Sequence, residues 1–518
     1  MTENAQSPLP TEAAGAASDL ADAGELFKAV LTGKPDDPLI EFRGVVYSRG
    51  WVSTVAGELE AILAETPPEY PIALVARNRP GHAAVIYGAI AQRRSISMMY
   101  GSQSSASLAR DLRQLRPTVV IADEQDWSDE VSAAAADISA IAVAIKLGSS
   151  GALYRTGVAH RSPTEPRRAL STPAVEVLSS GTTGPPKRMP LTFAQLSRVV
   201  QAHRAYLADG DANQNRGEIV YAPFSSMGGV WALMTVGGTG CKMILMEKFT
   251  VEEFVAHVRS LRPKSIGLFP ICLRMVLDAK VPKEAFASAE FATAGGALVD
   301  PALQEEFETT YGIPLLIAYG ATEFCGSVVA WTRQLREQYG RSKLGSVGRP
   351  LPGVSIRVVD AQTGAALPAG EQGVIEALVP RIRPDWIRTT DLAVIDEDGF
   401  VFHRGRADGA ISRGGFKIFP DAVAEALRRH PALSDACVVG LDDRRYGQVP
   451  VAVCEVKPGI AWPAETEMEQ FARRHLIAQH IPVRFLFVDQ LPRSAMMKVR
   501  IPEVKALVQA QLSPESSS

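Results

Sequence analysis

A loop rich in glycine and hydroxyl side chains follows the apolar segment 175–178 and ends in a lysine. Glycine lets backbone N–H groups turn toward a ligand, the hydroxyls add hydrogen-bond donors, and the lysine adds a positive charge, which together suit a polyphosphate. It is not a Walker-type loop, because no Gly-Lys-Ser/Thr follows at the required spacing. An ordinary surface turn is the alternative. The candidate phosphate-binding residues are Ser179, Ser180, Gly181, Thr182, Thr183, Gly184 and Lys187.

A second candidate is the segment 318–323, Ala-Tyr-Gly-Ala-Thr-Glu. We expect a strand to end here and Gly320 to turn the chain, at the edge where open α/β sheets bind ligands. Tyr319 could then stack on a base, Thr322 could bond a phosphate, and Glu323 could hold Mg²⁺ through oxygen. The alternative is a helix N-terminus with a favourable acidic first turn.

Two further charged residues are candidates. Asp391 follows a strand-like run, and a carboxylate there could accept hydrogen bonds from both hydroxyls of a ribose, although an aspartate in a turn is the simpler interpretation. Lys498 lies near the C-terminus, where a single lysine is usually a solvated surface charge.

In this order and at these separations, the motifs resemble the signature of the adenylate-forming superfamily, which includes acyl- and aryl-CoA ligases, luciferases and peptide-synthetase adenylation domains. The resemblance covers roughly residues 27–507. It implies an adenine-side element at Gly295, Gly296 and Ala297, and ribose contacts from Asp391 and Arg406. It also implies a hinge at Asp408, a pantetheine tunnel lined by Gly414 and Gly415, and contact of Lys498 with the carboxylate and α-phosphate oxygens during adenylation.

The sequence departs from the family pattern at three places. Thr390 stands where glycine is usual before the aspartate, and Met496 and Met497 replace the usual Ser-Gly before the lysine. The segment 223–229 lacks the histidine that many relatives have. By resemblance the acid pocket draws on Phe224, Met227, Gly228, Trp231 and Ala321, and the two bulky side chains favour an aromatic or otherwise bulky apolar acid over acetate.

Strand-like and helical patterns alternate along most of the chain, which predicts an α/β fold with mostly parallel sheet. Expected strands include 72–76, 219–224, 314–318 and 355–359, and an expected helix spans 251–261. We predict a disordered tail over 1–24 and an N-terminal adenylation domain over 25–407, with a β-rich subdomain at about 345–404. A small, mobile C-terminal α/β lid domain follows over 408–518.

Composition narrows the class of protein. The 518 residues are 46% hydrophobic and 21% charged, as in a globular protein, and the net charge of −3 disfavours nucleic acid as a partner. The five cysteines are scattered without metal-ligand spacing, and no apolar run is long enough for a membrane span. We expect a cytoplasmic enzyme, either a monomer or a homodimer.

The resemblance implies ATP-dependent activation of a small-molecule carboxylic acid to an acyl-adenylate, followed by transfer to CoA, with Mg²⁺ held by Glu323 and Thr182. No carrier domain follows in this sequence, which favours CoA or another free acceptor. An amine or a carrier-protein thiol as the acceptor is the first alternative. A nucleotide-binding protein whose catalysis has decayed is the second.

Overall fold

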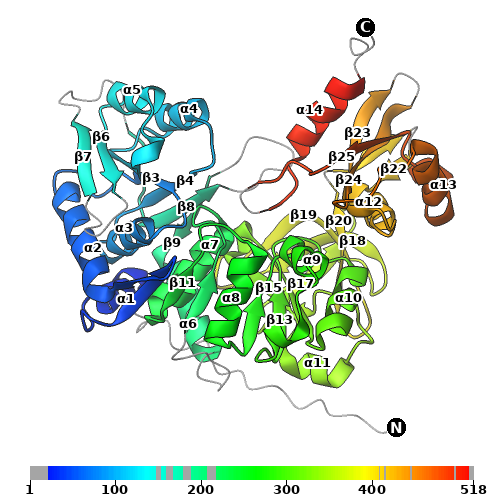
Figure 1. Ribbon diagram of the computed structural model, residues 1–518, viewed down its shortest axis with the longest axis horizontal. Coiled ribbons are helices and arrows are strands. Elements are labelled where there is room, and N and C mark those ends of the chain that lie inside the picture. The colour runs from blue at the N-terminus through cyan, green and yellow to red at the C-terminus, as the bar shows by residue number, and fades with distance from the viewer. Residues whose placement is uncertain are drawn as a thin grey trace.

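The computed structural model describes residues 22–146, 153–158, 167–178, 188–206, 217–407, 409–413, 416–443, 446–494 and 497–512. It is a mixed α/β protein with a large N-terminal domain and a small C-terminal domain, the latter orange to red in Figure 1. No helix in these ranges is long and apolar enough to cross a membrane. Some predicted site residues lie outside the described ranges: Ser179 to Gly184, Lys187, Asp408, Gly414, Gly415 and Met496.

The first large sheet has seven strands in the order β7-β6-β5-β3-β4-β8-β9, parallel except at its two edges. All residues of β3 are buried, because Ile72 and Leu74 face one core while Ala73 and Val75 face another. This is the pattern of a parallel strand covered on both faces. The strands are β3 (Ile72–Ala76), β4 (Ile96–Tyr100), β5 (Val119–Asp123), β6 (Ile141–Ile145), β7 (Leu153–Val158), β8 (Ala174–Leu178) and β9 (Arg188–Thr192).

Two groups of helices cover this sheet, visible at the left of Figure 1. The core on one face includes α1 (Ala23–Leu31), α2 (Arg49–Leu63) and α3 (Pro80–Ala91). The core on the other includes α4 (Ser105–Leu115) and α5 (Asp129–Asp137), and the short η1 (Glu124–Asp126) follows β5. Helix α6 (Phe193–Tyr206) begins with a capping box, in which Thr192 and Gln195 each accept the other's backbone N–H.

A four-stranded sheet in the order β10-β11-β1-β2 packs into the same core. Its strands are β1 (Pro38–Phe42), β2 (Val45–Ser48), β10 (Glu218–Val220) and β11 (Met243–Leu245). The chain between β10 and β11 forms α7 (Met227–Ala232), which runs on into the π-helical turn η3 (Leu233–Gly237).

The sheet β12-β13-β14-β15-β16 is parallel over its first three strands and antiparallel thereafter. The strands are β12 (Ser265–Gly267), β13 (Phe291–Ala294), β14 (Leu315–Ala321), β15 (Gly326–Ala330) and β16 (Arg349–Pro350). The helices of this region are α8 (Val251–Leu261), α9 (Pro270–Asp278), η4 (Lys283–Phe286), α10 (Pro301–Tyr311), η5 (Thr322–Phe324) and α11 (Arg333–Tyr339). The antiparallel sheet β17-β18-β19-β20 shares its core. Its strands are β17 (Ser355–Val359), β18 (Gln372–Leu378), β19 (Trp386–Ile395) and β20 (Val401–Arg406).

The C-terminal domain has hydrophobic cores of its own on both faces of one sheet. Along β23, Ala436 and Val438 pack with α12 and α13, whereas Cys437 and Val439 pack with α14. The strands are β21 (Ile411–Arg413), β22 (Phe416–Ile418), β23 (Leu433–Asp443), β24 (Gly447–Val456) and β25 (Arg484–Val488). The helices are α12 (Pro420–Arg428), α13 (Glu465–His475), η6 (Ala478–His480) and α14 (Ile501–Leu512).

Many expected elements are confirmed, including the strands 72–76 and 355–359 and the helix 251–261. The prediction for 318–323 is wrong in one respect: β14 continues to Ala321, so the chain does not turn at Gly320. The expected strand 219–224 is shorter, because β10 ends at Val220 and the N–H of Phe224 instead donates to the side chain of Asn78.

Candidate active site

The site is centred on Asp391, which lies within β19 rather than in a turn. The hydroxyl of Tyr319 on β14 donates to its Oδ2 at 2.6 Å. Burial and the nearby carboxylate raise the pKa of Tyr319 far above its usual value, so the phenol keeps the proton that it donates. Two motifs far apart in the sequence therefore meet through a charge-assisted hydrogen bond.

Two side chains of β20, His403 and Arg406, face the other oxygen of Asp391. His403 Nε2 lies 3.8 Å and Arg406 Nη1 3.6 Å from Oδ1. The backbone N–H of Gly405 donates to His403 Nδ1, which leaves the proton of a neutral His403 on Nε2, toward the carboxylate. Burial opposes ionisation of Asp391, but His403, Tyr319 and Arg406 outweigh it and hold the pKa of that carboxyl below its usual value. Asp391 is therefore an anion at neutral pH.

Gly320 is required by a close approach of two strands. It pairs with Ser327 of β15, and a Cβ on it would lie 2.2 Å from the carbonyl oxygen of Gly326. The chain then enters the short helix η5, which presents Glu323 at the surface. Glu323 makes no hydrogen bond or ion pair with any residue in the described ranges, so its oxygens are open to a ligand. Thr322 beside it is half-buried.

Gly295 and Gly296 follow β13 next to this edge of the sheet. A Cβ on Gly295 would lie 3.0 Å from the carbonyl oxygen of Ala318, and Gly296 has a φ of +81°, in the left-handed region that favours glycine. Ala297 is exposed. The segment predicted to face the adenine thus lies beside the β14 strand that carries Tyr319 and Gly320.

Lys498 reaches this site from the C-terminal domain on a tight hairpin. Arg493 and Val499 form an antiparallel bridge, and the N–H of Ser494 donates to the carbonyl oxygen of Lys498 at 2.7 Å. Burial lowers the pKa of the Lys498 ammonium and Arg406 adds to this lowering, while the carboxylates of Asp391 and Glu323 act in the opposite direction. Four predicted site residues from four separate segments of the sequence are therefore electrostatic neighbours.

Two of the departures from the family pattern, Thr390 and Met497, have different structural outcomes. Thr390 lies within β19 and has no left-handed backbone, so a β-branched residue fits there. Met497, in contrast, has a φ of 58°, where a residue other than glycine costs about 1 kcal/mol. The usual glycine of the motif would adopt this conformation without that cost.

The predicted acid pocket is built around α7. Ser226 caps this helix, and Gly229 is required because its Cβ would lie 1.9 Å from the carbonyl oxygen of Pro223. The ring of Trp231 packs against Gly326 of β15, whose Cβ would lie 2.5 Å from it. Met227 and Gly228 on α7 and Ala321 on β14 are half-buried, whereas Phe224 is completely buried in the core.

Several residues of the site were missed by reasoning from sequence. Asn78, at the end of β3, accepts from Phe224 N–H at 3.0 Å and donates to the carbonyl oxygens of Ala222 and Met246, which fixes the segment before α7. His403 faces Asp391, and Arg493 anchors the hairpin of Lys498. The signal for Asn78 was its position just after a buried parallel strand.

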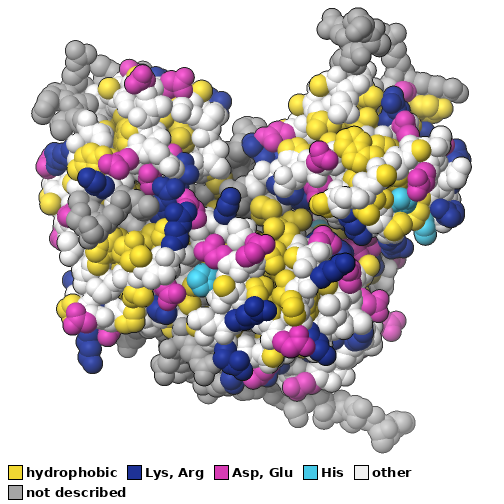
Figure 2. Space-filling model, viewed as in Figure 1, with side chains coloured by type: hydrophobic (Ala, Val, Ile, Leu, Met, Phe, Trp, Pro, Cys, Tyr) yellow, Lys and Arg dark blue, Asp and Glu magenta, His cyan; other side chains and the backbone are white. Residues whose placement is uncertain are grey.

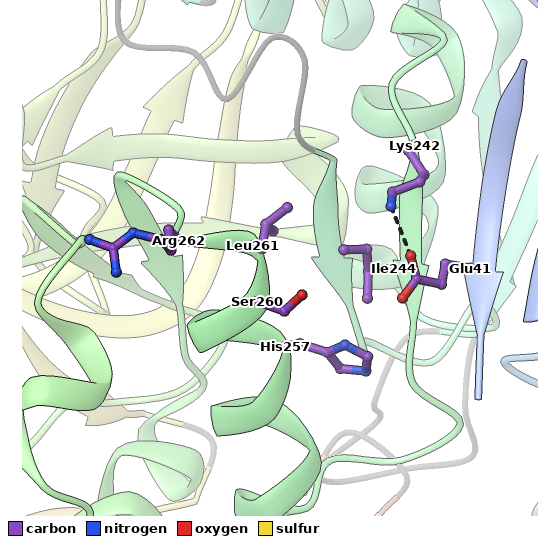
Figure 3. A pocket seen from close by; sticks show the side chains of 7 residues that line it. All are labelled: Glu41, Lys242, Ile244, His257, Ser260, Leu261 and Arg262. Atoms are coloured by element: carbon purple, nitrogen blue, oxygen red, sulfur yellow. Dashed lines mark hydrogen bonds and ion pairs between the residues drawn. The ribbon is translucent and has the colours of Figure 1, made fainter. Parts of the chain in front are cut away.

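Figure 2 shows the molecule hollowed between the upper part of the N-terminal domain and the C-terminal domain. A separate pocket of about 390 Å³ lies elsewhere, between β11, β1 and the end of α8 (Figure 3). An ion pair of 2.8 Å between Lys242 and Glu41 spans its wall, and His257 and Arg262 also line it. It contains none of the predicted site residues.

Mg²⁺ in proteins is commonly held by one or two carboxylates together with substrate phosphates. The exposed carboxylate of Glu323, which has no hydrogen-bond or ion-pair partner among the described residues, fits that role. No group of three His, Cys, Asp or Glu side chains in the described ranges forms a metal site by itself. The other predicted ligand, Thr182, lies outside the described residues.

Comparison with known proteins identifies relatives of this chain. A sequence profile described as AMP-binding enzyme matches residues 33–377, and one described as AMP-binding enzyme C-terminal domain matches residues 422–498. A fatty acid–[acyl-carrier-protein] ligase of Streptomyces coeruleorubidus is 28% identical over 382 residues, which are 68% of this chain and 71% of that protein.

Solved structures share the fold over almost the whole chain. ATP-bound MatB from Rhodopseudomonas palustris has a TM-score of 0.78 at 22% identity, covering 95% of this chain and 100% of that one. The o-succinylbenzoate coenzyme A synthetase of Bacillus subtilis, in complex with ATP and a magnesium ion, has a TM-score of 0.74 at 20% identity, covering 93% and 99%. Because the first profile alone matches more than half of its residues, this chain belongs to the family of AMP-binding, adenylate-forming enzymes.

Proposed function

We propose that this protein activates a carboxylic acid with ATP and transfers the acyl group to the thiol of CoA. In the first step a carboxylate oxygen of the acid attacks the α-phosphorus of ATP and pyrophosphate leaves, giving an acyl-adenylate. In the second step the sulfur of the thiol, having lost its proton, attacks the acyl carbon and AMP leaves. The observation that carries the proposal is the 2.6 Å hydrogen bond between Tyr319 and Asp391, which brings together two motifs of the family to which the chain belongs.

In the first step, we assign the site residues to the ribose, the base, the reacting oxygens and the phosphates of ATP. Asp391, ionised and oriented by Tyr319, accepts the ribose hydroxyls, and Tyr319 with Gly295 to Ala297 flanks the base. Lys498 places its ammonium against the reacting carboxylate and α-phosphate oxygens, where charge is redistributed as the new bond forms. Mg²⁺, when bound at Glu323 and Thr182, supplies charge neutralisation for the phosphates. The loop 179–187 binds the phosphates themselves.

CoA is the acceptor that we propose, and a carrier-protein thiol is the second candidate because a relative bears the name of an acyl-carrier-protein ligase. For the second step we propose that the C-terminal domain, over 408–518, turns about Asp408 and brings Gly414 and Gly415 to the thiol. The acid is bulky and apolar in part, since Met227 and Trp231 contribute large side chains to the pocket.

The test is a panel of carboxylic acids with purified protein and Mg-ATP, read by AMP and pyrophosphate release with and without CoA or a carrier protein. We expect pyrophosphate only with an acid, and a bulky acid to exceed acetate in kcat/KM. Release of ADP and orthophosphate would refute adenylation, and acetate as the best acid would refute the pocket assignment. If the thioester forms only on the carrier protein, the acceptor is the carrier-protein thiol and not CoA.

Variants then separate the two steps. Lys498→Ala should lower adenylation about 10²–10³-fold, as for a lost electrostatic donor, and spare thioester formation from supplied acyl-adenylate. Gly415→Leu should do the reverse by crowding the thiol. Lys505→Ala, an exposed lysine of α14, is the control for loss of a positive charge in the same domain. Equal losses in both steps for Lys498→Ala and Gly415→Leu would rule out the alternating domain.

A further inference from the structure

Asn78 joins two sheets of the N-terminal domain through its side chain. It is buried in the turn between β3 and α3, at the carboxyl end of a strand of the seven-stranded sheet. Its Nδ2 donates to the carbonyl oxygens of Ala222 at 3.0 Å and Met246 at 3.3 Å, and its Oδ1 accepts the N–H of Phe224 at 3.0 Å. Because these residues follow β10 and β11, all three bonds cross to the four-stranded sheet.

These three bonds need the particular chemistry of an asparagine side chain. Two backbone carbonyl oxygens require donors and one backbone N–H requires an acceptor, and a primary amide supplies both on one short side chain. An aspartate would place a carboxylate against the two carbonyl oxygens. A leucine of similar shape would remove the partner of all three backbone groups, which are costly to bury unpaired.

The neighbouring Arg79 holds the turn that carries Asn78. Its guanidinium lies 2.7 Å from the carboxylate of Asp123 at the end of β5. It also lies 2.6 Å from the carboxylate of Glu247, the residue after Met246. The turn is therefore anchored on both sheets, and Asn78 extends from a fixed position.

A short, continuous set of contacts leads from Asn78 to the proposed acid pocket. Asn78 binds the residues on both sides of Pro223. The carbonyl oxygen of Pro223 accepts the hydroxyl of Ser226 at 2.6 Å, and Ser226 Oγ accepts the N–H of Gly229 at 3.0 Å, which caps α7. A Cβ on Gly229 would lie 1.9 Å from the same carbonyl oxygen, so α7 cannot approach Pro223 more closely. The start of α7 thus lies where Asn78 places Pro223.

The position of α7 in turn determines the room left for an acid. The ring of Trp231 packs against Gly326 of β15, where a Cβ would lie 2.5 Å from the ring, and Gly326 pairs with Ala321. Met227 lies about one turn before Trp231 on the same helix. A displacement of the start of α7 would therefore move both large side chains relative to β15.

We propose that Asn78 is a positioning residue for acid specificity, which acts by fixing the start of α7 and with it the size of the acid pocket. The inference rests on the proposed function, because it names a residue that controls which acid the same site activates. Without its three bonds, α7 would take up a range of positions, and the pocket would discriminate less between bulky and small acids. The nucleotide contacts are spared, since Asp391 and Tyr319 lie on β19 and β14 and bind each other.

The test measures AMP formation with acids from acetate to bulky ones, for wild type, Asn78→Leu and Ser226→Ala. We expect Asn78→Leu to lower kcat/KM for the preferred bulky acid about ten- to a hundredfold, chiefly through KM for the acid, and to change acetate much less. KM for ATP at saturating acid should stay near that of wild type. Ser226→Ala is the milder change, one step further along the same contacts, and should reduce the preference for the bulky acid by a smaller factor.

Gln304→Met is the matched control. Gln304 is also a fully buried amide, which donates to Glu308 and accepts the N–H of Gly345, but it lies on α10, away from α7. Its loss of stability in urea unfolding should be similar to that of Asn78→Leu, and its preference among acids should be that of wild type. Equal losses for the bulky acid and acetate in Asn78→Leu, or the same change of preference in Gln304→Met, would overturn the inference.

Hydrogen exchange of the backbone amides reports on α7 independently of activity. Asn78→Leu should speed exchange over residues 222–232 and leave β19 and β20 unchanged. Unchanged exchange over 222–232 would overturn the inference even if the rates of AMP formation fall. If wild type forms no AMP with any acid, the proposed function is refuted, and the exchange measurement still decides whether Asn78 fixes α7.

Discussion

The hairpin that carries Lys498 is held by one buried arginine, and removing that arginine should damage adenylation selectively. Arg493 is 8% exposed and donates to Asp435 at 2.6 Å, to Glu455 at 3.2 Å and to the carbonyl oxygen of Met497 at 3.3 Å. It thus ties the turn before Lys498 to two strands of the C-terminal sheet. The perturbation is Arg493→Met, which keeps most of the side-chain volume and removes these bonds.

The magnitude follows from the number of partners that are lost. Hydrogen bonds between charged groups contribute about 1.5–3 kcal/mol, and Asp435 keeps its bond of 2.7 Å from Arg428, so we expect a loss of about 2–3 kcal/mol in the free energy of unfolding. Misplacement of a catalytic group by about 1 Å costs about 10²-fold in rate. Adenylation should therefore fall about ten- to a hundredfold, with thioester formation from supplied acyl-adenylate almost unchanged.

Arg428→Met is the matched control. It removes the other guanidinium on Asp435, and the bonds of Arg428 go to Asp435 and to the carbonyl oxygen of Ala436, not to the hairpin. Its stability loss should be similar, measured by urea unfolding, but its adenylation rate should stay near that of wild type. The assay is single-turnover pyrophosphate release at a temperature where both variants are folded. Equal adenylation losses in the two variants would show that stability, not placement of Lys498, explains the effect.

Two further predictions concern the charges at the site. Burial lowers the pKa of Lys498 below the ordinary lysine value of 10.5, so the ammonium loses its proton at a lower pH than an ordinary lysine. Adenylation should therefore fall as the pH rises through this lowered pKa, and the same decline in Lys498→Met would contradict the prediction. Asp391 has its Oδ2 bound by Tyr319 and its Oδ1 beside His403 and Arg406. Asp391→Asn should therefore raise KM for ATP about tenfold or more and abolish the preference for ATP over 2′-deoxy-ATP. The assay is steady-state kinetics with ATP and 2′-deoxy-ATP. If Asp391→Asn keeps the full preference for ATP, Asp391 does not bind the ribose hydroxyls.

The features of the fold and of the site that depend on local sequence could be predicted from hydrophobic periodicity and from the order of the motifs. The strand 72–76 could be predicted because its five residues are all apolar, and the structure buries all five. Lys498 and Asp391 could be named because their motifs resemble those of the family. The Gly320 prediction failed because glycine serves either a turn or a close approach, and the strand that approaches, β15, cannot be recognised before the pairing is known.

The positioning residues could not be predicted for a related reason. His403 is one of several polar residues on β20, and only the pairing of β20 with β19 brings it to Asp391. Arg493 can hold the hairpin only because it donates hydrogen bonds to Asp435 and Glu455, which lie 58 and 38 residues away in the chain.

The burial of Lys498 also links nucleotide affinity to the arrangement of the two domains. Taking an ammonium out of water is unfavourable, and the lowered pKa of Lys498 shows that the nearby carboxylates do not compensate fully. Anionic phosphate oxygens would reverse this balance, so ATP should favour the docked position of the C-terminal domain. By thermodynamic reciprocity, any change that loosens docking must weaken ATP binding by the same factor, even when it touches no atom of the nucleotide.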